Sequence, residues 1–446
     1  MVDTMPTRKT AAPEAGRMPS LAGDIRHLIP KLGLRNYWYP AITARKVPKN
    51  RPVQVRMLGE DLVFLQAKNG EAVALTDICP HRGARLSEGH VHWKGTVACP
   101  YHGWVFDEEG RNVAVLSEGP ESRVCGKPGT EAKKYPTRTL KGVVFVWIGD
   151  TAPAPIEEDV PEEFFKDNAY ILWNDHVVWN TNWLVALENS QDSHVGYLHR
   201  DNMQALLGGE VGGAPGPDGY RPIFTGAGLK LDYTQRRGVR RAGVIDVYPN
   251  GWRWPKHNYR GVWNWLFAPL LTILRVPSPT PSDPVSWGGG HRLPGMYRFG
   301  PQKRPLKSPL DMFKRDDGGL MGMYTRMPVA LEPWKTRLWY FHWMEPKNAL
   351  QKYWWKLTYN TVLRWMGEYN FSAQDGSMMF NQRYDTPEKL SGTDAEVIQW
   401  RKLVVTKAYG GRNAPFGYER EKDTGIEERA AAAVLGGKFG RDMNQP

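Results

Sequence analysis

The sequence has 446 residues, 41% of them hydrophobic and 24% charged, and its mean hydropathy of −0.54 is typical of a folded chain with room for two or three domains. Its longest nearly continuous apolar run, residues 266–274, is far shorter than the roughly 20 residues of a membrane span, so a transmembrane protein is not expected. The net charge of +12 favours an acidic partner through electrostatic steering, but no Lys/Arg block or nucleic-acid-binding motif points to nucleic acid.

The first 35 residues are rich in proline, alanine, glycine and charge, without the apolar segment of a secretory signal. We therefore expect residues 1–35 to form a peripheral tail and the protein to stay in the cytoplasm. The cysteines are Cys79, Cys99 and Cys125, too few for a disulfide framework. A reducing compartment would keep their thiols available as metal ligands.

Residues 36–150 contain short runs of β-branched and aromatic residues separated by Gly-containing turns, which predicts an antiparallel β domain. The next stretch, residues 151–163, is rich in proline and acidic residues and is expected to be a linker. Strands are expected at residues 53–57, 62–68, 72–78, 96–100 and 143–150.

Residues 164–410 combine Trp-rich strand patterns, such as residues 337–345, with helical patterns, which predicts a second domain of the α+β class. Residues 411–446, rich in glycine and charge, are expected to be a second tail. Helices are expected over residues 182–194, from about Gln351 toward Arg383 with interruptions at Gly367 and Gly376, and from Thr393, where Glu396 completes a capping box.

Two mixed pairs of metal-binding residues lie in the β domain: Cys79 with His81 and, after 17 intervening residues, Cys99 with His102. Zinc is one candidate metal, but zinc fingers usually group a cysteine pair and a histidine pair. A dinuclear cluster accounts for the mixture, because two adjacent loops each supply a cysteine to one iron and a histidine to the other. This is the ligation of a Rieske 2Fe-2S cluster.

The CxH and CxxH motifs resemble, in order and spacing, those of the Rieske non-heme iron oxygenases. The resemblance implies an N-terminal all-β Rieske domain followed by an α+β catalytic domain, in which an antiparallel sheet and helices carry a mononuclear iron. The sequence is more similar to the homotrimeric branch, with the carbazole and oxoquinoline oxygenases, than to the naphthalene-type branch with its small β subunit.

A second set of metal ligands is expected in the segment ENSQDSHVGYLH, residues 188–199. His194 and His199, joined by a carboxylate from far along the chain, would form the two-histidine, one-carboxylate triad of a non-heme Fe(II) oxygenase. Residues five apart are rotated by about 140° on a regular helix, so the two histidines share a face only if the helix is broken. Gly196 would supply that break. The alternative is a pair of histidines at a packed helix end.

Asp375 is the carboxylate that we assign as the third ligand of this iron. It lies on the late helical pattern, and its context in YNFSAQDGSMMFNQR resembles the C-terminal ligand motif of the family. Glu368 and Asp385 are the alternatives.

The acidic residue that couples the two iron sites is less clearly marked. Family members commonly carry the spacing DxxHxxxxH, in which the aspartate forms a hydrogen-bonding bridge between a cluster histidine and an iron-bound histidine. Here the spacing is DxHxxxxH, from Asp192 to His194 and His199. When the histidine pair is the anchor, Gln191 takes the bridging place and Glu188 becomes a second acidic candidate. We assign the bridge to Asp192, because a carboxylate orients an imidazole and tunes its basicity.

The resemblance also implies an activity. It predicts an O2-dependent oxidoreductase, the terminal oxygenase component, which hydroxylates an aromatic or heteroaromatic substrate at the mononuclear Fe(II). It implies a homotrimer in which each cluster serves the iron of the adjacent subunit. The sequence carries no clear nucleotide-binding fold or plant-type ferredoxin cysteines, so electrons from NAD(P)H are expected through a separate reductase and ferredoxin. The alternatives are O- or N-demethylation, oxidation of a non-aromatic polycyclic substrate, and electron transfer alone.

Overall fold

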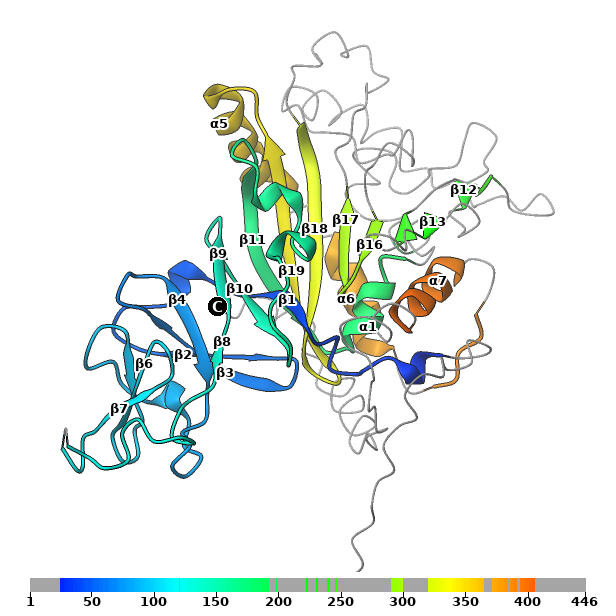
Figure 1. The fold of residues 1–446 in the computed structure, drawn as a ribbon. Helices are drawn as coiled ribbons and strands as arrows, with labels where there is room; N and C mark the ends of the chain where they lie inside the picture. Colours follow the sequence, from blue (N-terminus) through cyan, green and yellow to red (C-terminus); the bar gives the residue numbers. More distant parts are fainter. Residues whose placement is uncertain are drawn as a thin grey trace, which may run out of the picture.

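The structure, a computed structural model, describes residues 25–119, 121–191, 290–299, 320–364, 371–382, 386–390 and 394–405, together with Leu198 and four two-residue strands between 222 and 246. In these residues the chain forms a smaller, all-β part, drawn in blue and cyan in Figure 1, and a larger part in which helices pack on one long sheet. The sheets are antiparallel throughout, so the predicted α+β class is confirmed.

The smaller part contains three antiparallel sheets, with strand orders β2-β3-β4-β8, β5-β6-β7 and β1-β10-β9. The predicted strand at residues 53–57 is β2, and the other four predicted strands overlap β3, β4, β5 and β10. The bounds are β1 Tyr37–Thr43, β2 Val53–Met57, β3 Glu60–Gln66, β4 Ala72–Thr76, β5 Thr96–Ala98, β6 Trp104–Asp107, β7 Asn112–Val115, β8 Lys134–Tyr135, β9 Thr137–Leu140 and β10 Val143–Ile148.

The larger part is built on a five-stranded sheet with the order β11-β19-β18-β17-β16. Because side chains alternate across a strand, β19 supplies Trp339 and Phe341 to one face and Leu338 and Tyr340 to the other. The second face is covered by helices α1 and α6. The bounds are β11 Tyr170–Trp179, β16 Gly290–Arg292, β17 Met296–Phe299, β18 Leu320–Glu332 and β19 Lys335–Glu345, with the short strands β12 Pro222–Ile223, β13 Lys230–Leu231, β14 Val239–Arg240 and β15 Ile245–Asp246.

Strands β1 and β10 join the two parts in one hydrophobic core. Every residue of both strands is buried, as their continuous apolar sequences require. The connection between the parts adds Phe164, whose ring lies edge-on to Phe145 of β10 and to Phe341 of β19, at centroid distances of 5.0 and 5.1 Å. The core therefore runs without interruption from the smaller part into the long sheet.

The connection that was expected to be a linker is packed. It forms two 3-10 turns, η4 Ile156–Glu158 and η5 Glu162–Phe164, and buries the apolar side chains of Ile156 and Val160. Asp159 is fully buried and accepts a hydrogen bond from the backbone N–H of Trp38 at 3.0 Å. The connection therefore contributes to the core.

The helices differ from the predicted ones mainly in length. The pattern from Gln351 onward forms two helices, α5 and α6, and a π-helical turn, Tyr359–Leu363, follows α5. Gly376 does not interrupt α6: a Cβ there would lie 3.3 Å from the indole nitrogen of Trp179, so the glycine permits close packing. No helix among the described residues is long and apolar enough to cross a membrane. The bounds are α1 Trp183–Glu188, α5 Ala349–Thr358, α6 Ser372–Asn381 and α7 Ala395–Leu403.

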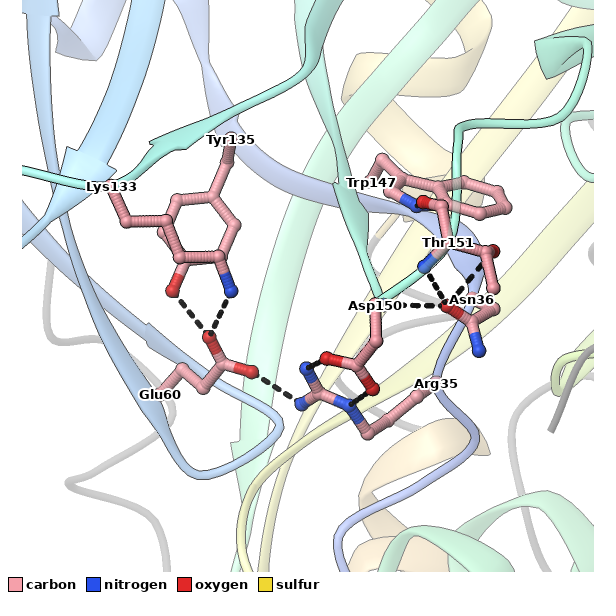
Figure 2. A network of polar contacts seen from close by, with 8 residues as sticks. All are labelled: Arg35, Asn36, Glu60, Lys133, Tyr135, Trp147, Asp150 and Thr151. Carbon is pink, nitrogen blue, oxygen red and sulfur yellow. Dashed lines mark hydrogen bonds and ion pairs between the residues drawn. The ribbon is translucent and has the colours of Figure 1, made fainter. Parts of the chain in front are cut away.

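Residues 25–36 form an N-terminal arm that is packed and not part of a peripheral tail, since Ile25, Ile29 and Leu34 are buried in the core. A polar network ties this arm to the smaller part, as Figure 2 shows. Arg35 donates two hydrogen bonds to Asp150, at 3.2 and 3.0 Å, and this lowers the pKa of that carboxyl group. Arg35 also pairs with Glu60 at the turn between β2 and β3, and Glu60 accepts a second hydrogen bond from the hydroxyl of Tyr135. Asn36 has a positive φ of 66°, and its side-chain oxygen accepts from the backbone N–H of Asp150 at 2.7 Å. The network therefore holds the residues that precede β1 against those that follow β10.

Candidate functional site

The first candidate site consists of two loops with the same backbone pattern. Cys79 follows β4 by three residues and Cys99 follows β5 directly. In the first loop the carbonyl of Cys79 accepts from the N–H of Gly83 at 2.9 Å, and in the second that of Cys99 accepts from Gly103 at 3.1 Å. Both glycines have positive φ, 76° and 66°, which L side chains rarely adopt. The repeated CPxxG-type turn thus presents two cysteines in equivalent positions.

The four predicted cluster ligands come together with sulfur inside and nitrogen outside. Cys79 and Cys99 are 1% and 4% exposed and belong to the core of the smaller part. The His81 and His102 rings lie beside each other at a centroid distance of 4.5 Å, and His81 stacks on Trp104 at 4.9 Å with nearly parallel planes. The two loops thus bring the two thiols next to each other and the two imidazoles next to each other.

The protonation of these groups fits a metal cluster. Burial, and secondarily the neighbouring Cys99 thiol, raises the pKa of Cys79 to about 12. The Cys79 sulfur therefore needs a cationic partner to become a thiolate, and iron supplies that charge. Partial desolvation and the nearby His81 and Arg82 lower the pKa of His102, which favours the neutral imidazole that binds metal. The donor set thus fits a Rieske cluster.

Cys125 lies apart from these loops. Its thiol is partly buried and donates to the side-chain oxygen of Asn112 at 3.4 Å. It packs at the edge of the core that contains Cys79 and Cys99. Cys125 is therefore a packed thiol outside the two loops.

The second candidate site is described in part. Asp192, His194 and His199, the predicted bridge and two iron ligands, lie outside the described residues, as do the alternatives Glu368 and Asp385.

Asp375, the predicted third ligand, lies in the first turn of α6 and is 3% exposed. Its Oδ1 accepts a hydrogen bond from the side-chain amide of Asn189, at 3.3 Å. The structure therefore brings Asp375 to the end of α1, the helix that leads into residues 192–199. A buried carboxylate thus lies beside the helix that precedes the two predicted histidine ligands in the sequence.

A buried arginine that the sequence analysis missed lies next to this carboxylate. Arg326 of β18 donates through Nη2 to the side-chain oxygen of Asn189 at 2.8 Å and to the backbone carbonyl of Ala186. Its guanidinium lies 5.1 Å from the ring centre of Trp179, a cation–π contact. Burial acts to lower the pKa of Arg326, but Tyr340 and Asp375 raise it, so the group is a cation.

Glu188, the alternative bridging residue, is paired with another buried arginine. Arg401 of α7 donates to both carboxylate oxygens, at 2.6 and 2.7 Å. Glu388 accepts from the same guanidinium at 2.5 Å and pairs with Arg26 at 3.0 Å. This chain of ion pairs ties α1 to the C-terminal helix and to the N-terminal arm. No local sequence pattern predicts it, because Glu188 and Arg401 are 213 residues apart.

We expect the substitution Arg401→Met to destabilise the fold by about 3 to 5 kcal/mol, because it leaves the buried Glu188 without its counter-charge. Burial already raises the pKa of Glu188 to about 7 against the lowering effect of Arg401, and removal of Arg401 raises it further. The unfolded carboxyl has a pKa near 4.5, so the folded state binds the extra proton and loses stability as the pH rises. Urea unfolding should therefore show a larger loss at pH 8 than at pH 6.

The double variant Glu188→Gln/Arg401→Met is the control for this prediction. It removes both charges and should recover part of the lost stability at pH 8. Equal losses at the two pH values would show that the effect of Arg401 comes from packing alone.

Two segments of the chain match families of known proteins. Residues 37–130 match the family described as Rieske [2Fe-2S] domain, and residues 147–249 match the family described as homotrimeric ring hydroxylase. The terminal oxygenase component of carbazole 1,9a-dioxygenase from Metapseudomonas resinovorans is 34% identical over 193 residues, 42% of this chain and 49% of that protein. Its counterpart from a Sphingomonas species is 36% identical over 195 residues, 42% of this chain and 50% of that protein. The chain thus spans about half the length of these relatives.

Solved structures extend the likeness to the fold of most of the chain. The terminal oxygenase of carbazole 1,9a-dioxygenase from Nocardioides aromaticivorans IC177 has a TM-score of 0.63 and 24% identity, and the match covers 87% of this chain and 98% of that one. A structure titled as the reduced complex between oxygenase and ferredoxin in carbazole 1,9a-dioxygenase has the same TM-score at 22% identity, with coverage of 88% and 94%. The chain therefore contains a Rieske [2Fe-2S] domain and a segment similar to the homotrimeric ring hydroxylases, and it has the fold of the carbazole dioxygenase terminal oxygenases.

Proposed function

We propose that the protein is a terminal oxygenase component, which uses O2 and electrons relayed through a Rieske cluster to hydroxylate an aromatic or heteroaromatic substrate at a mononuclear Fe(II). The observation that supports this proposal is that candidate metal ligands occur in two separate places in the structure. One is the pair of Cys/His loops, and the other is the buried Asp375, held at the end of α1. A protein that only transfers electrons needs the first set alone.

In this proposal Cys79 and Cys99 hold one cluster iron through thiolates, and His81 and His102 hold the other through neutral imidazoles. When bound, a Rieske cluster passes single electrons, and a ferrous ion with open coordination positions activates dioxygen. The chain's own contribution is positional. The buried cysteines fix the cluster inside the small core, and the stacking of His81 on Trp104 fixes one imidazole toward the surface.

His194, His199 and Asp375 hold the mononuclear iron, and Asp192 bridges it to a cluster histidine of the adjacent subunit in a homotrimer. The contacts of Glu188 support this choice of bridge. Both of its oxygens accept short hydrogen bonds from Arg401 in a buried position, so its carboxylate is committed within its own subunit.

Electrons come from NAD(P)H through a separate reductase, ferredoxin or both, since the complex of a similar oxygenase with a ferredoxin is among the solved structures. The net charge of +12 supports an acidic partner. The protein works in the cytoplasm, where reducing conditions keep Cys79 and Cys99 free of disulfides before the cluster is built. The substrate is a small aromatic or heteroaromatic compound, by likeness to the carbazole dioxygenase components.

One preparation tests this function. Protein purified without oxygen should contain about three irons and two acid-labile sulfides per chain, from one 2Fe-2S cluster and one further iron. Reduced with dithionite and mixed with O2 and a panel of carbazole-like, biaryl and methoxy-substituted aromatic compounds, it should consume oxygen and form a hydroxylated product with at least one of them. Two irons, two sulfides and no product would instead indicate electron transfer alone. Bound zinc without sulfide would contradict both functions.

A further inference from the structure

The two segments that carry the predicted iron ligands meet at one amide. α1 leads into residues 192–199, and α6 carries Asp375, 186 residues away from Asn189 in the sequence. The Asn189 amide nitrogen donates to Asp375 Oδ1 at 3.3 Å across this gap. Both side chains are 3% exposed, so water does not compete for the contact.

The orientation of this amide is set by Arg326. An asparagine side chain has one acceptor oxygen and one donor nitrogen, and it can present either to a neighbour by a flip. Arg326 has only donors, and its Nη2 lies 2.8 Å from the Asn189 oxygen. The amide must therefore turn its oxygen to Arg326 and its NH2 group to Asp375. A hydrogen bond to a cation also polarises the amide and makes its NH2 group a stronger donor.

Arg326 is itself held firmly. Its Nη2 also donates to the carbonyl of Ala186 in the last turns of α1, and its guanidinium packs on the ring of Trp179 at 5.1 Å. Arg326 is 4% exposed and lies on β18, in the middle of the five-stranded sheet. Contacts with both the sheet and α1 therefore fix the position of the Asn189 amide.

We propose that Arg326 is a positioning residue for the mononuclear iron: through Asn189 it fixes the orientation of the Asp375 carboxylate by a hydrogen bond to Oδ1. This inference rests on the proposed assignment of Asp375 as an iron ligand. Residues that orient a metal ligand in this way change the metal affinity about 10- to 100-fold when they are replaced.

Asn182 provides a matched control. It is the N-cap of the same helix, is 2% exposed, accepts from the N–H of Leu184 at 2.9 Å and donates to the carbonyls of Lys31 and Pro333. None of these contacts reaches Asp375. The substitution Asn182→Ala thus removes a buried amide of α1 without touching the predicted ligand.

The test is an anaerobic titration of the whole chain, which keeps its cluster but has lost its mononuclear metal. Fe(II) is added in competition with a chromogenic chelator, and the Fe(II) dissociation constant is measured. Asn189→Ala and Arg326→Met should each raise the Fe(II) dissociation constant about 10- to 100-fold, with an unchanged cluster absorption spectrum. The double variant Asn189→Ala/Arg326→Met should bind Fe(II) no more weakly than Asn189→Ala alone. Both changes break the same chain of contacts, from Arg326 through Asn189 to Asp375. Asn182→Ala should lower the thermal midpoint and leave the dissociation constant within about threefold of the parent.

Several results would overturn the inference. These are Fe(II) binding as tight as in the parent for Asn189→Ala and Arg326→Met, additive losses in the double variant, or an equal loss in Asn182→Ala. If Arg326→Met does not fold, the Fe(II) dissociation constants of Asn189→Ala and Arg326→Lys test the inference instead. Lysine keeps the positive charge but lacks the planar guanidinium group. Asp375→Ala separates the two proposals. Loss of Fe(II) there with normal binding in Asn189→Ala rejects only the role of Arg326, whereas normal binding in Asp375→Ala rejects the ligand assignment itself.

Discussion

Replacing Cys99 with alanine should remove the cluster completely, leaving at most one iron and no labile sulfide per chain. The reason is that two thiolates must hold the same iron, and Cys79 alone cannot do so. The change should also destabilise the smaller part, because Cys79 and Cys99 lie inside its hydrophobic core and the cluster crosslinks two loops there. We expect the red-brown absorption and all turnover to be lost, as visible spectra, sulfide analysis and oxygen uptake would report.

The matched control is Cys125→Ala in the same domain. Cys125 donates only to Asn112 among its identified contacts and lies outside the two loops, so this variant should keep the cluster spectrum and the sulfide content of the parent. A Cys99→Ala protein that still contains two sulfides would place the cluster elsewhere. A Cys125→Ala protein without sulfide would show that cluster loss follows from any thiol removed from this domain.

The substitution Asp375→Ala should abolish turnover and remove the third iron, with the cluster spectrum and both sulfides retained. Two imidazoles without the carboxylate form an incomplete triad, and Asn189 would lose the acceptor that its amide contacts at 3.3 Å. The measurement is iron and sulfide content in parallel with single-turnover product formation. About three irons should fall to two while sulfide stays at two.

Asp159→Ala is the control for loss of a buried carboxylate. Asp159 is fully buried and accepts from the N–H of Trp38, far along the chain from α6. The substitution Asp159→Ala should lower the free energy of unfolding by about 1 to 3 kcal/mol and leave the third iron bound. Retention of iron and turnover in Asp375→Ala would move the third ligand to Glu368 or Asp385.

The features that the sequence predicted well are local ones. Cys79, His81, Cys99 and His102 all fall within 24 consecutive residues, and the loops that hold them close through hydrogen bonds four and five residues apart. Strands such as β10 were predictable because a continuous apolar run of that length has to be buried on both faces. The spacing of these four residues in the sequence therefore predicts most of the first site.

The contacts around the second site could not be predicted in this way. Arg326 and Asn189 are 137 residues apart, and Arg401 and Glu188 are 213 apart, so their pairing depends on the tertiary fold. An arginine in a strand such as β18 usually indicates a solvent-facing position, and only the packing of α1 on the sheet reveals the burial of Arg326. The connection at residues 151–163 was misleading for a similar reason. Its proline and acidic composition is typical of a linker, and the burial of Ile156 and Val160 depends on distant partners.

The uninterrupted core between the two parts limits how electrons can travel. A cluster domain that swings between a donor and an acceptor would have to pull Phe164 out from between Phe145 and Phe341. Exposing a buried aromatic side chain costs about 1.5 to 3 kcal/mol, and Trp343, whose ring centre lies 4.7 Å from that of Phe164, would be exposed as well. Under the proposed function, such a movement is too costly to occur in each catalytic cycle. The Rieske domain would therefore be a stationary carrier, with its position relative to the long sheet set when the chain folds.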